Sequence, residues 1–114
     1  MRPLFQAFRP QLLLVSAGFD AHWNEPITGL GLSISGFLSV SKELLKLASE
    51  FCQGKAVFVL EGGYNPENVA GGADAVFSAL SGSAPAPDAP GPSPYREPEI
   101  EALVSEIREW HGFT

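Results

Sequence analysis

The chain has 114 residues, which is enough for one small domain and too few for two. Its formal net charge is −6 and its seven Lys and Arg residues are scattered, so we expect no nucleic-acid partner and no membrane partner, both of which need clustered basic residues. The single cysteine, Cys52, excludes an internal disulfide, and no run approaches the roughly 20 apolar residues that a membrane-spanning helix needs, so we expect a soluble, cytoplasmic protein.

The sequence begins with a short helical pattern followed by an apolar strand pattern. Leu4, Phe5 and Phe8 have helical spacing, but Arg9-Pro10 ends the segment. We interpret it as the last turns of a helix whose beginning is absent, as in a truncated gene or a gene fragment. Residues 12–16 form a short apolar run that leads into small residues, which is typical of a parallel strand covered on both faces.

A helix, a second strand and another helix are predicted next. Residues 33–52 have helical periodicity, with serines at their start that can cap the helix. Residues 56–60, AVFVL, are apolar and uncharged, as in a buried strand. Asn65 and Pro66 then suit the start of a helix, and Gly82 suits its end. A helix that connects two apolar strands predicts a parallel pair with a right-handed crossover.

The last part of the chain differs in composition. Residues 83–96 are rich in Ala and Pro and predict an extended linker, and a helical pattern follows as far as Trp110. We therefore divide the chain into residues 1–82, part of an α/β domain; residues 83–96, the linker; and residues 97–114, the C-terminal helix. Because two strands do not complete a parallel sheet, we expect the chain to be one part of a larger α/β domain.

Two loops with unusual composition each follow a predicted strand. SAGFDAH carries Asp20, and EGGYNP carries Gly62, Gly63 and Tyr64. The carboxyl ends of parallel strands meet at one edge of a sheet, where ligands gather, so Asp20 and Tyr64 are expected at the same edge. A carboxylate there can bind a divalent metal, and a tyrosine hydroxyl, protonated at neutral pH, can donate a hydrogen bond to a developing oxyanion.

Plainer roles are open for each of these residues. Taken alone, the pattern favours Asp20 as a turn cap and Tyr64 as a half-buried packing residue. Gly62 and Gly63 suit an ordinary turn, and they lack the spacing of a dinucleotide-binding loop. His22 can join a metal site, although a loop histidine bonded to main chain or water is more common.

Taken together, the two loops and their strands resemble a known family. LLLVSAGFDAHWNEP, GLGLS and VFVLEGGYN, in this order and spacing, resemble the C-terminal part of the zinc-dependent histone deacetylase superfamily. The likeness is greatest to the class II and bacterial branch, which includes acetylpolyamine amidohydrolases and acetoin-utilisation proteins, and it covers residues 4–80. It implies an arginase/deacetylase-like α/β fold with a parallel sheet.

The resemblance also implies roles for individual residues. Asp20 matches one of the two aspartates that hold zinc together with a histidine. Tyr64 matches the tyrosine that hydrogen-bonds the acetyl carbonyl and stabilises the tetrahedral intermediate, and Gly62 and Gly63 match the base of the substrate tunnel. Glu25 stands where the family often has aspartate before proline. The roles of Glu25 and His22 stay open.

The family's Asp-x-His zinc motif and its general-base histidine pair are not matched in this sequence. Catalytic zinc needs about three protein ligands and an open position. We therefore expect the C-terminal segment of a zinc-dependent deacetylase that acts on acetyl-lysine, an acetylated polyamine or a small acetylated amine. We expect it to be inactive without the missing N-terminal part of the domain. The alternative is a non-catalytic fragment or remnant that acts only by docking onto a partner.

Overall fold

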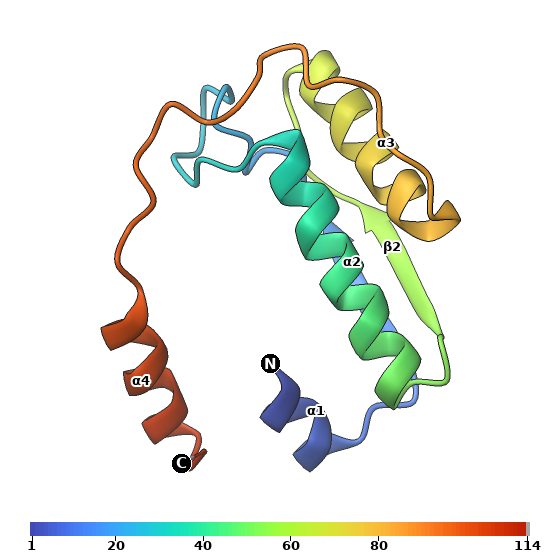
Figure 1. Cartoon of the computed structure of the whole chain (residues 1–114), viewed down its shortest axis with the longest axis vertical. Coiled ribbons are helices and arrows are strands. Elements are labelled where there is room, and N and C mark those ends of the chain that lie inside the picture. The colour runs from blue at the N-terminus through green and yellow to red at the C-terminus, as the bar shows by residue number, and fades with distance from the viewer. Residues whose placement is uncertain (114) are drawn as a thin grey trace.

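A two-stranded parallel sheet joins the two loops of interest. The computed structural model describes residues 1–113. Strand β1 (Leu13–Ala17) pairs with β2 (Ala56–Leu60) in a simple register, from Leu13 opposite Ala56 to Ala17 opposite Leu60. Helix α2 (Ile34–Phe51) forms the crossover between them (Figure 1). The predicted α/β class with a parallel strand pair is confirmed.

Helices α2 and α3 begin at the capping residues that the sequence predicts, and α3 also ends at its predicted glycine. The Ser33 hydroxyl accepts a hydrogen bond of 3.3 Å from the Gly36 N–H at the start of α2. The Asn65 side chain accepts one of 3.0 Å from the Glu67 N–H at the start of α3 (Pro66–Ser81). Gly82 ends α3 with φ 73°, a left-handed conformation that glycine adopts without a steric penalty.

The main core lies between the sheet and the helices α2 and α3. Phe19, from the loop after β1, packs edge-on against Phe37 of α2, with ring centroids 5.4 Å apart. Gly72 of α3 makes room for Phe19, since a Cβ there would lie 2.1 Å from the Phe19 ring. Complete burial of a phenylalanine contributes about 1.5–3 kcal/mol, so this contact fixes the loop that carries Asp20.

A second cluster holds the other end of α2. Phe5 of α1 (Arg2–Phe8) packs there with Leu47, Ala48 and Cys52, and Cys52 is buried. The Arg2 guanidinium forms an ion pair with the Glu50 carboxylate. The short first helix therefore covers the end of the sheet that is remote from the two loops (Figure 1).

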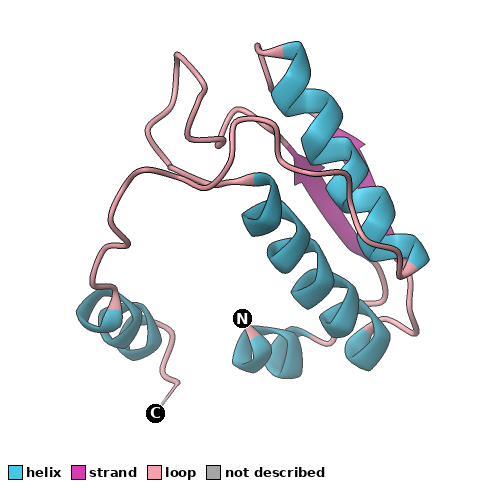
Figure 2. Ribbon diagram, turned by 45° about the horizontal axis from the view of Figure 1, so that its top comes forward, coloured by secondary structure: helices cyan, strands magenta, loops and turns pink. Residues whose placement is uncertain are grey.

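Within the described residues, 1–113, one face of the sheet is covered and the other is not. Leu13 and Ala17 pack against the two clusters, while Leu14 between them is 66% exposed. Val57 and Val59 of β2 are also exposed on the outer face. Residues 1–113 cover only the inner face, because α2 and α3 pack together on the same side of the sheet (Figure 2). The outer face is left as exposed apolar surface.

The part of the chain after α3 is irregular until α4 (Glu101–Trp110). Three hydrogen bonds hold the irregular part to the body: Trp23 Nε1–H to the Gly91 carbonyl (3.1 Å), Ile34 N–H to Asp88 (3.0 Å) and Ala86 N–H to Asp74 (2.7 Å). Helix α4 buries none of its residues and stands away from the core (Figure 1). Among residues 1–113, no helix has the length and apolar content needed to cross a membrane.

Candidate functional site at the carboxyl edge of the sheet

The loops after β1 and β2 leave the sheet at the same edge and are bonded to each other. The Glu61 N–H donates to the Ala17 carbonyl (3.1 Å), which extends the pairing one residue beyond the strands. The Phe19 N–H then donates to the Gly62 carbonyl (2.7 Å). The expected juxtaposition of the Asp20 loop and the Tyr64 loop is therefore present in the structure.

The Asp20 carboxylate lies against the main chain of two glycines. A Cβ on Gly62 would be 2.9 Å from Asp20 Oδ2, and a Cβ on Gly18 would be 2.8 Å from Oδ1. Both distances are shorter than real Cβ contacts allow, so only glycine leaves this space for the carboxylate. Asp20 is half-buried, and the Thr28 hydroxyl donates a hydrogen bond to its main-chain oxygen rather than to its carboxylate. The carboxylate itself lies beside Gly18 and Gly62.

Gly63 has a different reason to be glycine. Its φ of 142° is one that side-chain-bearing residues rarely adopt, and a Cβ there would lie 2.4 Å from Val69 Cγ2. The turn at Gly63 redirects the chain from β2 towards α3 and places Tyr64 between them. Tyr64 is 62% exposed, so the alternative of a half-buried packing residue does not describe it.

Glu25, whose role the sequence leaves open, is a buried acid at this edge. It is only 6% exposed. Its carboxylate accepts hydrogen bonds from the Tyr64 N–H (3.2 Å), the Asn65 N–H (3.1 Å) and the Asn68 side-chain amide (2.9 Å). Burial by itself raises the pKa of Glu25, but these three bonds and the nearby His22 outweigh it and lower that pKa below its ordinary value. The sequence hints at this role of Glu25 in one way only: an acidic residue stands in the loop that follows a buried strand.

His22 is fully buried and faces the core. Its Nδ1 accepts a hydrogen bond of 3.1 Å from the Asn24 N–H, and its ring stacks on Phe37 with centroids 6.4 Å apart. Nε2 has no hydrogen-bond partner within the described residues. Burial lowers the pKa of His22, although the charges of Asp88 and Glu25 act in the opposite direction, which favours the neutral ring.

The residues of this edge do not amount to a complete metal site. Within residues 1–113, no three His, Cys, Asp or Glu side chains come together in a way that could hold a metal ion. Asp20 could supply a single carboxylate ligand, because its partly exposed carboxylate lies where the loops after β1 and β2 meet. A catalytic zinc ion needs about two further protein ligands, so the described residues do not fit that ion by themselves.

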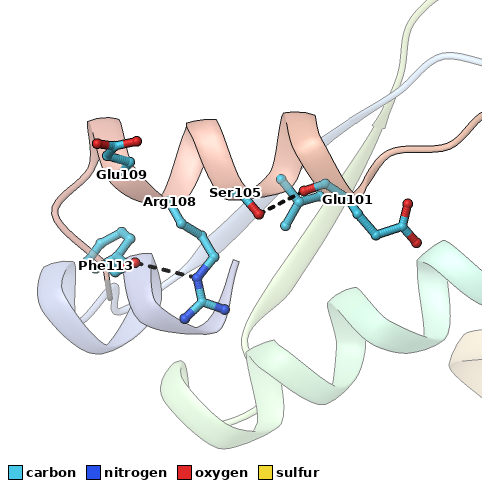
Figure 3. A pocket seen from close by; sticks show the side chains of 6 residues that line it. Glu101, Ser105, Arg108, Glu109 and Phe113 are labelled. Carbon is cyan, nitrogen blue, oxygen red and sulfur yellow. Dashed lines mark hydrogen bonds between the residues drawn. The ribbon is translucent and has the colours of Figure 1, made fainter.

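A separate hollow on α4 does not belong to this site. Glu101, Ser105, Arg108, Glu109 and Phe113 line it, and all of them come from α4 or the turn that follows (Figure 3). The Ser105 hydroxyl and the Arg108 Nε–H both donate to main-chain carbonyls of the same segment. No other element contributes a lining side chain among the described residues, so this hollow is the surface of one helix.

The sequence profile of the histone deacetylase domain matches residues 1–80. Histone deacetylase 14, chloroplastic, of Arabidopsis thaliana is 42% identical over 80 residues, which are 70% of this chain and 19% of that protein. A probable deacetylase of Archaeoglobus fulgidus is 39% identical over 67 residues, 59% of this chain and 19% of that protein. The structure of the histone deacetylase Clr3 superposes with a TM-score of 0.69 at 28% identity, covering 92% of this chain and 16% of Clr3.

Proposed function

Because this chain belongs to the histone deacetylase domain family, we propose that its carboxyl edge is part of a zinc-dependent deacetylase site. The chain spans about a fifth or less of the length of the curated relatives that it matches. The complete activity therefore needs further polypeptide of the same domain, and the substrate is an acetylated lysine, an acetylated polyamine or a small acetylated amine. The observation that carries the proposal is the fit of the Asp20 carboxylate against Gly62, two residues before Tyr64.

In this proposal Asp20 supplies one carboxylate ligand. Gly18 and Gly62 keep the space that the carboxylate occupies, and the packing of Phe19 fixes the main chain next to it. A zinc ion, when bound, would polarise the acetyl carbonyl and lower the pKa of a bound water. The remaining ligands and the general base come from outside residues 1–113, since these residues contain no ligand set of three.

Tyr64 is the proposed catalytic residue of this chain. Its phenolic O–H can donate a hydrogen bond. The exposed side chain is free to point its hydroxyl at an acetyl carbonyl whose oxygen becomes negative during attack by water. Removal of a single donor of this kind costs about 100- to 1,000-fold in turnover in other enzymes.

A chimera tests the proposal. Residues 1–80 replace the matching segment of the Arabidopsis histone deacetylase 14, and we measure bound zinc and deacetylation of an acetyl-lysine peptide. We expect the chimera to be active, Asp20→Asn to lose zinc, and Tyr64→Phe to keep zinc but lose most of its turnover. Asp74→Asn, which changes an acid on α3 away from the edge, is the matched control and should change neither. Unaltered zinc and turnover in Asp20→Asn or Tyr64→Phe would contradict the assigned role.

The exposed outer face of the sheet favours a second candidate function, docking without catalysis. Leu14, Val57 and Val59 form an apolar surface that a further layer of a deacetylase domain would cover. The test mixes the 114-residue chain with the remaining part of the Arabidopsis protein. A complex that binds zinc and deacetylates the peptide supports the first function, and a stable complex without activity supports the second.

A further inference from the structure

Glu25 connects the loop of the proposed metal ligand to the loop of the proposed catalytic tyrosine. It lies five residues after Asp20 in the chain, and its carboxylate is bonded to the main chain at Tyr64 and Asn65. The side chain is almost completely buried, so these bonds are shielded from water. A buried carboxylate that accepts three hydrogen bonds holds its donors more strongly than a neutral group could.

We propose that Glu25 is a positioning residue for Tyr64: it fixes the main chain from which the tyrosine side chain extends. Tyr64 needs such a clamp, because its ring is mostly exposed and receives little support from packing within this chain. Gly63, directly before Tyr64, makes the turn possible but has no side chain whose packing could hold the main chain at Tyr64. The position of the Tyr64 hydroxyl therefore depends on how well its Cα is held. This inference rests on the proposed function, because it takes Tyr64 to be the oxyanion donor.

The arrangement of donors explains why a carboxylate is required. Oε2 accepts from the Tyr64 N–H, while Oε1 accepts both from the Asn65 N–H and from the side-chain amide of Asn68 in the first turn of α3. A glutamine at position 25 would turn an N–H₂ group towards an N–H donor and leave at least one bond unmade. An aspartate is shorter by one C–C bond, about 1.5 Å, and could not reach all three donors without a shift of the loop.

The negative charge also lies at the start of α3. Asn65 caps this helix, and its N–H and that of Tyr64 precede the first turn. A carboxylate at a helix N-terminus is stabilised by the helix dipole, so the helix dipole of α3 also stabilises the Glu25 carboxylate that accepts these hydrogen bonds. Loss of the charge should therefore loosen residues 64 and 65 more than it loosens α3 itself.

The first test uses the 114-residue chain itself. We would measure amide hydrogen exchange at Tyr64 and Asn65 in the wild type, Glu25→Gln and the control Glu67→Gln. Glu67 is an exposed acid in the first turn of α3, so its substitution removes the same charge near the same helix. We expect exchange at both amides to become roughly tenfold faster or more in Glu25→Gln and to change little in Glu67→Gln. Equal exchange rates in Glu25→Gln and the wild type would overturn the inference.

The second test is a double-mutant cycle in the chimera. Glu25→Gln should lower kcat by up to about a hundredfold, with little change in KM or zinc content. Added to Tyr64→Phe, it should lower kcat no further, because the hydroxyl that it positions is already gone. The milder variant Glu25→Asp, which keeps the charge, should fall between the wild type and Glu25→Gln.

The outcomes separate the inference from the function on which it rests. If Tyr64→Phe leaves kcat unchanged, the proposed function fails. If Tyr64→Phe lowers kcat but Glu25→Gln does not, only the role of Glu25 fails. An equal further loss in the Tyr64→Phe background, or a loss of zinc in Glu25→Gln, would mean that Glu25 supports the fold or Asp20 rather than Tyr64.

Discussion

The carboxylate of Asp20 lies directly above the main chain of Gly62, so close that a methyl group on Gly62 would sit 2.9 Å from Oδ2. This contact joins residues that are 42 positions apart in the chain, one after each strand of the sheet. It exists because the strands are parallel and in register, so that both loops start at the same level. Gly18 and Gly62 therefore help to set the position of the Asp20 carboxylate, because neither has a side chain that would displace it.

Substitution of Gly62 by alanine should displace the Asp20 carboxylate without disturbing the turn. The backbone of Gly62 does not have the positive φ of its neighbour Gly63, so alanine is compatible with its conformation, and only the steric contact changes. In the chimera we expect zinc affinity and turnover to fall by about 10- to 100-fold, as for other groups that orient a ligand.

Gly29→Ala is the matched control for Gly62→Ala. It lies in the same loop as Asp20, and nothing is within 4 Å of its added Cβ. Zinc content and turnover should stay at the level of the unsubstituted chimera. If Gly62→Ala binds zinc as tightly as Gly29→Ala does, the carboxylate is not held in the position that the structure gives it.

Two helix glycines should respond to alanine in opposite directions. A Cβ on Gly72 of α3 would lie 2.1 Å from the Phe19 ring, whereas a Cβ on Gly36 of α2 meets its nearest neighbour at 3.6 Å. Gly72→Ala should destabilise the chain by about 1–3 kcal/mol through overpacking. Gly36→Ala should stabilise it by about 0.5–1 kcal/mol, because alanine loses less backbone entropy in a helix. Urea unfolding of the 114-residue chain measures both, and equal midpoints would contradict the packing of Phe19.

The stability of the chain should depend on the charge of Glu25 below neutral pH. Burial raises the pKa of Glu25, but the bonds from Asn68, Asn65 and Tyr64 lower it overall, below the 4.5 of an ordinary glutamic acid. The unfolded chain therefore takes up a proton at higher pH than the folded chain does. The contribution of Glu25 is complete above about pH 4.5 and is lost as the pH falls through the lowered, folded-state pKa.

A comparison of Glu25→Gln with the wild type isolates this contribution. The free energy of unfolding of each is measured by urea denaturation from pH 7 downwards. The difference between them should be constant above about pH 4.5 and shrink at lower pH. A difference that grows on acidification would mean that the folded state prefers the protonated acid, contrary to the three hydrogen bonds.

Much of the fold follows from local patterns. The strand at residues 56–60, the Asn65 cap and the Gly82 end of α3 were all predicted at their observed positions, since each depends on neighbouring residues only. The uncovered face of the sheet was not predicted. An apolar run such as LLLVS indicates that both faces of a strand are covered, but it does not say whether the covering residues belong to the same chain.

The edge of the site was predictable in part. Chain order and a parallel pairing were enough to bring the Asp20 loop and the Tyr64 loop together. The clamp at Glu25 was not predictable, because its three partners lie 39 to 43 residues away and two of them are main-chain N–H groups, which have no signature in a sequence. The burial of His22 was missed for a similar reason, since a loop position usually indicates exposure.

Neighbouring leucines on β1 provide a test of the uncovered face. Leu13 packs into the cluster formed by α1 and α2, whereas Leu14 is 66% exposed on the outer side. In the 114-residue chain, Leu13→Thr should be strongly destabilising, by about 2–4 kcal/mol, because it places a hydroxyl in the cluster and removes apolar contacts. Leu14→Thr should change the free energy of unfolding by no more than about 0.5 kcal/mol, because Leu14 makes few contacts within this chain.

The same pair should behave differently in the chimera. We expect the outer face to pack against the rest of the domain there and to bury Leu14, so Leu14→Thr should destabilise the protein about as much as Leu13→Thr does. Thermal unfolding of both variants, in the chain and in the chimera, measures this change. If Leu14→Thr were equally harmless in both settings, the outer face would not be the surface on which further layers of the domain pack. If it were equally harmful in both, Leu14 would already be covered in the isolated chain.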